Sequence, residues 1–137
     1  MIARGLISAV LMVLLFTGVQ GQDQELLLKI NDINGVTTVV SSASSSSSSS
    51  CNSPDFPVLR GGDRKDVNFG ELSWITVVHD KPAKDPGIYI KVELTLKNGV
   101  VEEYEMIRNV RFMGKSGQED FSILVEEVNT VQLSGNQ

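Results

Sequence analysis

The chain has 137 residues, with twelve Lys and Arg, seventeen Asp and Glu, and a formal net charge of −5 at pH 7. This length suits one small domain, because a domain takes roughly 100–200 residues, and it excludes a large multidomain enzyme. The acidic balance argues against nucleic acid as a partner, since phosphate is recognised by basic surfaces.

The first 21 residues have the pattern of a secretory signal peptide. Arg4 gives a positive start, residues 6–16 are apolar except for Ser8, and Val19 and Gly21 suit a cleavage site after residue 21. The apolar run is too short for a membrane span, which needs about 20 residues. We therefore expect an exported protein, periplasmic or extracellular, with no stable membrane span after cleavage. Its 116 remaining residues (137 − 21) carry a net charge of −6, because Arg4 is the only charge removed.

Residues 22–40 are predicted to form an N-terminal β-hairpin. The apolar-rich segments 26–33 and 36–40 flank Asn34-Gly35, a pair that favours a tight turn because both residues tolerate positive φ.

The serine-rich segment 41–57 is predicted to be disordered. Ten residues, SSASSSSSSS, lack apolar surface, and Pro54 and Pro57 follow. The segment is either an insertion within one fold or a linker to a separate domain. Cys51 is the only cysteine, which excludes an intramolecular disulfide and a thiolate cluster; its role stays open between a free thiol and an intermolecular bridge.

Residues 58–133 are predicted to form a β domain, followed by a flexible tail at 134–137. Strands are expected at 67–69, 72–79, 88–97, 100–107, 109–113, 120–125 and 129–133, with a helical turn at 125–128 and an exposed loop at 81–87. The fold class is therefore all-β: a small antiparallel β-barrel of the SH3-like kind, or a compact sandwich. Such an architecture does not define a function.

The hairpin over residues 88–107 has a predictable register. A two-residue Asn98-Gly99 loop would set glutamates against the apolar face, whereas a three-residue loop with Gly99 in a bulge pairs Val92 with Tyr104. Burying carboxylates is costly, so we predict the bulged loop. It leaves one mismatch, Leu94 against Glu102, on the core face.

The two halves of the chain resemble each other weakly. Segments 66–78 and 120–132 can be aligned at an offset of 54, while the two Asn-Gly pairs are 64 apart. A duplicated β unit with a ten-residue insertion would explain this difference, although chance similarity between β-forming segments would also explain it.

Catalytic chemistry has little support in the sequence. His79 is the only histidine, and it begins a loop, so we predict no catalytic residues and no enzyme activity. Neither a metal ion nor a cofactor is expected, because zinc would need more His or Cys ligands and no segment has calcium-loop spacing.

Aromatic side chains give the least weak sign of binding. The candidate binding residues are Trp74, Tyr89, Tyr104 and Lys91. The aromatic rings among them could offer a stacking platform for a sugar or a peptide. We predict a small exported, non-enzymatic binding or structural module with a protein or glycan partner. Its working surface would be the sheet face that carries the residues Tyr89, Lys91, Glu93, Glu103 and Glu105, or an unpaired strand edge. The second hypothesis is a carbohydrate-binding module, and the third is a small hydrolase that uses His79. The oligomeric state stays open.

Overall fold

The computed structural model describes residues 26–47 and 50–135; the predicted signal peptide lies outside them. Within these residues the chain forms strands, two short 3-10 turns and connecting turns, with no α-helix, so the all-β prediction is confirmed. The elements are β1 (Leu27–Asp32), β2 (Thr37–Ser47), β3 (Ser50–Ser53), β4 (Asp55–Arg60), β5 (Asp63–Asn68), η3 (Phe69–Glu71), β6 (Leu72–Val78), β7 (Tyr89–Leu96), β8 (Val101–Ile107), β9 (Arg111–Ser116), β10 (Glu119–Leu124), η4 (Val125–Glu127) and β11 (Val128–Ser134).

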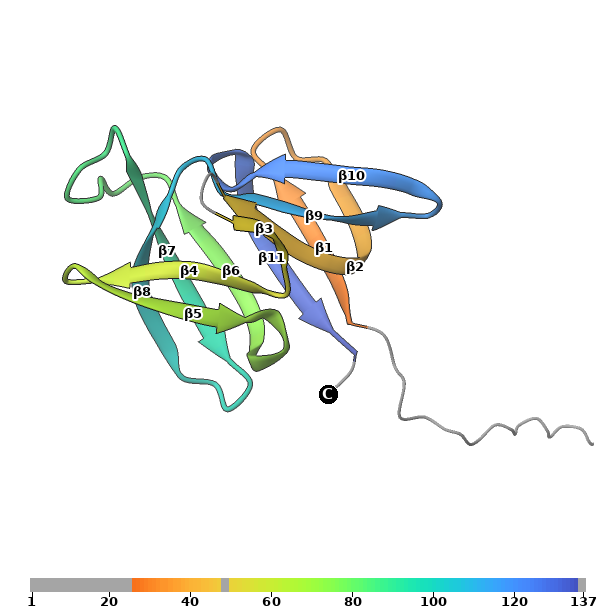
Figure 1. The fold of residues 1–137 in the computed structure, drawn as a ribbon, viewed down its shortest axis with the longest axis horizontal. Coiled ribbons are helices and arrows are strands. Elements are labelled where there is room, and N and C mark those ends of the chain that lie inside the picture. Colours follow the sequence, from red (N-terminus) through yellow and green to blue (C-terminus); the bar gives the residue numbers. More distant parts are fainter. Residues whose placement is uncertain (1–25, 48–49, 136–137) are drawn as a thin grey trace, which may run out of the picture.

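The strands form one curled antiparallel sheet. Its order is β10-β9-β2-β1-β11-β6-β7-β8-β4-β5, and β3 pairs with β2 beside this path (Figure 1). The inner face of the curl is the core. At its centre the rings of Phe56, Phe69 and Phe112 meet, with centroids 4.9 to 5.8 Å apart and each side chain at most 1% exposed. Aromatic contacts at this spacing add to the stabilisation from burial.

The predicted register of the 88–107 hairpin is confirmed. Val92 pairs with Tyr104 and Leu94 with Glu102, as the bulged loop requires. Gly99 has φ +91°, a conformation that favours glycine. The mismatched Glu102 is satisfied at the edge of the core, because its carboxylate accepts a hydrogen bond from the Tyr104 hydroxyl at 2.7 Å.

Apart from β3, which has no counterpart, the described elements form the same series twice. The first series is β1, β2, β4, β5, η3 and β6, and the second is β7, β8, β9, β10, η4 and β11. From β4 onward, every element of the first series starts 56 residues before its counterpart, as Asp55 does before Arg111. The predicted offset of 54 is therefore wrong by two. Since the Asn-Gly turns are 64 apart, the first series holds eight extra residues (64 − 56), all between the turn and β4.

The two series are interleaved in the sheet. Hairpin β1–β2 lies between β11 and β9, and hairpin β7–β8 lies between β6 and β4. Ile75 and Val131, which are counterparts 56 residues apart, pair directly with each other. A pseudo-twofold axis therefore passes between β6 and β11, and the two Asn-Gly turns lie at opposite ends of the molecule (Figure 1).

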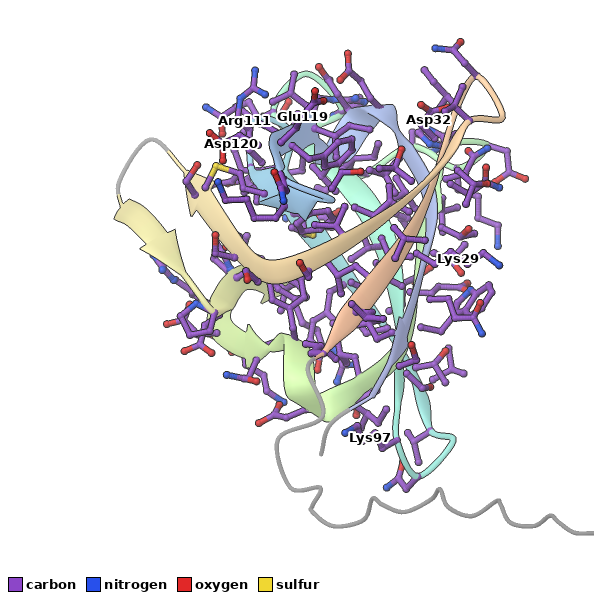
Figure 2. The ribbon with its side chains drawn as sticks, turned by 90° about the vertical axis from the view of Figure 1, so that its right-hand side faces the viewer. Lys29, Asp32, Lys97, Arg111, Glu119 and Asp120 are labelled. Atoms are coloured by element: carbon purple, nitrogen blue, oxygen red, sulfur yellow. The ribbon has the colours of Figure 1, made fainter. Side chains whose placement is uncertain are left out.

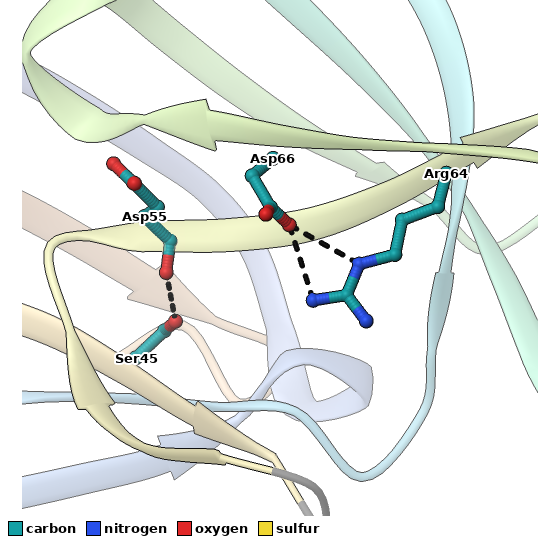
Figure 3. A network of polar contacts seen from close by, with 4 residues as sticks. All are labelled: Ser45, Asp55, Arg64 and Asp66. Carbon is teal, nitrogen blue, oxygen red and sulfur yellow. Dashed lines mark hydrogen bonds and ion pairs between the residues drawn. The ribbon is translucent and has the colours of Figure 1, made fainter.

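The serine-rich segment differs from the prediction of disorder over 41–57. Residues 41–47 belong to β2 and residues 55–57 to β4, while 48–49 lie outside the described residues. Ser45 is 2% exposed, and its hydroxyl donates to the Asp55 carbonyl at 2.7 Å (Figure 3). Small serine side chains allow β2 to approach both β9 and β4, so this segment closes the curl. Cys51 lies in β3, and Ser134, assigned to the tail, lies in β11.

A proline also falls inside a strand. Pro57 in β4 pairs with Asp66 of β5, whereas β4 pairs with β8 at Leu59 alone. A proline is tolerated in a strand where its position pairs with only one neighbouring strand. For this reason Pro57 did not prevent strand formation.

The N-terminal hairpin is part of the same sheet. β1 pairs with β11, and β2 pairs with β9, so the predicted boundary between residues 22–40 and 58–133 does not coincide with a break in the sheet. Figure 2 shows from the side how β1 lies next to β11, with Asp32 and Lys97 near opposite turns.

The two edge strands are charged. On β5 the Arg64 guanidinium contacts Asp66 at 3.2 Å (Figure 3), and on the β9–β10 hairpin Lys115 pairs with Asp120. Charges on an edge strand oppose pairing with other chains. In residues 26–47 and 50–135, no helix has the length and apolarity to cross a membrane.

Candidate functional site: a cleft on the outer face

A cleft of about 550 Å³ opens on the outer face of the sheet, where β7, β8 and the β4–β5 turn meet. Its size falls within the usual range for small-ligand sites, roughly 300–1,000 Å³. The lining residues are Leu59, Gly61, Gly62, Lys84, Asp85, Tyr89 and Glu105.

The cleft exists because β4 and β8 diverge. They pair only at Leu59 and Glu105, so a gap opens beside this point. The β4–β5 turn forms one wall. Gly61 and Gly62 both have positive φ, +60° and +88°, which a two-residue hairpin turn of this kind requires.

The opposite wall is the loop between β6 and β7, and its backbone is held at several points. The N–H of Lys84 donates to Glu105 Oε2 at 2.8 Å, and the N–H of Tyr89 donates to the Asp85 carbonyl at 2.9 Å. Arg108 donates from Nε to the Pro86 carbonyl at 2.6 Å. These hydrogen bonds fix the backbone of the wall, and a fixed wall reduces the entropy cost of binding.

Acidic groups dominate the charge around the cleft. Lys91 Nζ lies 3.6 Å from Glu103 Oε1. Glu93 stands directly opposite Glu103 in the β7–β8 ladder, a like-charged pair that is unfavourable. Among the described residues, no ion pair includes Asp85 or Glu105.

A second charged cluster lies beside the cleft. The Arg60 guanidinium is 4.4 Å from the centre of the Tyr104 ring and 4.0 Å from Glu102 Oε1. The hydrogen bond from Tyr104, followed by the attraction of Arg60, lowers the pKa of Glu102 below its ordinary value, and the same hydrogen bond raises the pKa of Tyr104.

The structure separates the four predicted binding residues. Tyr89 lines the cleft, and Lys91 lies next to it on the same face. Tyr104 is 6% exposed and faces the core, so it cannot belong to an exposed platform with Tyr89. Trp74 is 37% exposed, but it pairs with Thr95, six residues along β7 from Tyr89 and so about 20 Å away.

The other candidates from the sequence have simple structural positions. His79 is exposed, and its Nε2–H donates to the Val128 carbonyl at 2.8 Å. Within the described part of the chain, no group of three His, Cys, Asp or Glu side chains is placed to hold a metal ion.

Sequence reasoning missed five cleft residues, Leu59, Gly61, Gly62, Lys84 and Asp85. The Gly61-Gly62 pair was a usable signal for a hairpin turn, and the loop at 81–87 was predicted. Their proximity could not be predicted, because β4 itself was not.

Comparisons with protein-family models, with curated proteins and with solved structures found no match for the chain.

Proposed function

We propose that this protein is a non-enzymatic binding module of the cell envelope or extracellular space, and that its ligand occupies the outer-face cleft. The observation that carries the proposal is the cleft itself, with the Tyr89 ring and the Glu105 carboxylate on walls that are already ordered. A concave site with one aromatic side chain and a few fixed polar groups is the usual form of a binding site.

The test is an amide NMR titration of residues 22–137 with a library of soluble glycans and short peptides. A cleft ligand shifts the amides of residues 59–62, 84–89 and 105, and Tyr89→Ala weakens its binding at least fivefold. Trp74→Ala is the matched control, since it removes an exposed aromatic on the same face outside the cleft. If library ligands shift only amides outside the cleft, or shift none, the proposal is refuted.

A carbohydrate-binding module that uses Trp74 is the second candidate, and a different observation supports it. Cross-strand pairs form one continuous row over six strands, in the order Val39, Lys29, Gln132, Trp74, Thr95 and Val101. A sheet face with an exposed indole among polar side chains suits stacking against a sugar ring. Retention on insoluble polysaccharides that Trp74→Ala abolishes and Tyr89→Ala preserves would support this candidate; equal retention of both variants would exclude it.

We also propose a finer description of the fold, as two SH3-like units that exchange strands. Each unit has five strands in the order β11-β1-β2-β9-β10 or β6-β7-β8-β4-β5, with a 3-10 turn before the β11 or β6 strand. Export remains part of the proposal: N-terminal sequencing of the protein from an expressing culture should find a start near residue 22 outside the cytoplasm.

A further inference from the structure

We propose that the ligand of the cleft is a basic segment of a partner protein, and that one of its lysine or arginine side chains inserts between Tyr89, Asp85 and Glu105. This inference rests on the proposed function and adds the chemistry of the ligand to it.

Asp85 and Glu105 take part in none of the ion pairs of the described residues, although Lys84 lines the cleft with them. Glu105 uses one oxygen to accept the backbone N–H of Lys84, a neutral donor. Lys91 stands directly opposite Glu105 in the ladder, but its Nζ forms its ion pair with Glu103. The Asp85 carbonyl accepts the N–H of Tyr89. A cation in the cleft would contact two acidic groups and form charge-assisted hydrogen bonds with them.

The protein contains this arrangement, with its cation, on the other face of the same strands. There a guanidinium, that of Arg60, lies over the Tyr104 ring and close to the Glu102 carboxylate. The cleft has the corresponding aromatic ring, Tyr89, and two carboxylates, while its lining cation, Lys84, forms an ion pair with neither of them. A cation over an aromatic face is attracted to the ring, and Arg is the usual partner.

The surroundings favour a cation over other ligand classes. The facing pair Glu93 and Glu103 adds negative potential on the same sheet face, and the whole chain carries a net charge of −5. An anionic ligand would be repelled. A neutral glycan would leave the two cleft carboxylates without a compensating charge, and so would gain less from this site.

Lys84 gives the inference a distinctive signature. It lines the cleft and is the basic residue closest in sequence to Asp85. Because its charge opposes a cationic ligand, Lys84→Gln should strengthen binding, whereas a merely structural role for this loop predicts unchanged or weaker binding.

The experiment is a fluorescence-anisotropy titration of residues 22–137 with fluorescein-labelled hexa-arginine at 50 and 150 mM NaCl. Hexa-glutamate and maltohexaose are the anionic and neutral comparison ligands. We expect hexa-arginine to bind, Asp85→Asn with Glu105→Gln to weaken it at least tenfold, Tyr89→Leu to weaken it about threefold, and Lys84→Gln to strengthen it about twofold. The matched control is Glu71→Gln with Glu127→Gln, two exposed acids on the 3-10 turns, which removes the same charge.

Three outcomes would overturn the inference. Equal losses in the cleft variant and the control variant would mean that net charge alone attracts the peptide. Tighter binding of maltohexaose than of hexa-arginine, with the amide shifts in the cleft, would refute the basic ligand and leave the proposed function intact. Binding of hexa-arginine with shifts only outside residues 59–62, 84–89 and 105 would refute the inference and count against the proposed function.

Discussion

Replacing Gly114 by alanine tests whether the serine-rich strand is packed as tightly as the structure indicates. A Cβ at residue 114 would lie less than 3.0 Å from the Ser41 carbonyl oxygen and from Val40 Cγ1. Val40 is fully buried, and the oxygen belongs to the backbone of β2, so neither can move without separating β2 from β9.

The expected cost follows from two opposing terms. Overpacking of this kind destabilises by about 1–3 kcal/mol. The lower chain entropy of unfolded alanine offsets roughly 0.4–1 kcal/mol. The net loss is then about 1.3 kcal/mol, which would lower Tm by roughly 5–10 °C, since about 1 kcal/mol corresponds to roughly 4–8 °C in a domain near this size.

Urea and thermal unfolding, followed by circular dichroism, measure the effect on residues 22–137. Gly35→Ala is the control, because Gly35 has φ +82° and open space around it, so only backbone strain of about 1 kcal/mol is expected. If Gly114→Ala changes stability by less than about 0.5 kcal/mol, the close approach of β2 and β9 is refuted.

Three further changes test other parts of the structure. Ser45→Ala should destabilise by about 1–2 kcal/mol in urea unfolding, because the part-buried Asp55 carbonyl loses the hydrogen bond from the Ser45 hydroxyl, while Ser46→Ala should have little effect. Because the pKa of Glu102 is lowered in the folded state, its carboxylate stabilises the fold above the ordinary glutamate pKa of about 4.3, and this stabilisation is lost as the pH falls further. Glu102→Gln should therefore flatten the fall in Tm between pH 5 and 3. A protease site inserted at residues 84–85 should give two fragments that still elute together in size-exclusion chromatography, because β11 lies between β1 and β6.

Much of the fold could be predicted where local signals agreed. The Asn98-Gly99 hairpin has alternating apolar residues and one register that keeps carboxylates off the core, so its pairing was determined by local chemistry. The serine-rich segment could not be predicted in the same way. Its side chains have no apolar surface, so they give no local signal for a strand. The strand is stabilised by β9, which is distant in the sequence, and by Asp55, which follows a proline.

The candidate site was only partly accessible to prediction for a related reason. Tyr89 and Glu105 followed from the polar face of one hairpin, whereas the wall formed by the β4–β5 turn depends on where β4 is placed. Tyr104 was misassigned as a binding residue, although the predicted register, which pairs it with Val92, already placed it on the core face. Its partners there are Glu102, which accepts the hydrogen bond from the hydroxyl, and Arg60, which lies over the ring.

Although the strands of the two halves correspond, the residues that form the cleft are not repeated. β4 pairs with β8 at Leu59 and Glu105. In the other half Lys115 corresponds to Leu59 and Ser41 to Glu105, so the carboxylate that faces the cleft is not repeated. Asp85 and Lys84 lie in the loop that joins the two series, and a connection between two halves has no counterpart within either. The acidic cleft therefore depends on one divergent ladder position and one unique loop. It should be a single site per chain, so titration with hexa-arginine should reach saturation at one peptide per protein molecule.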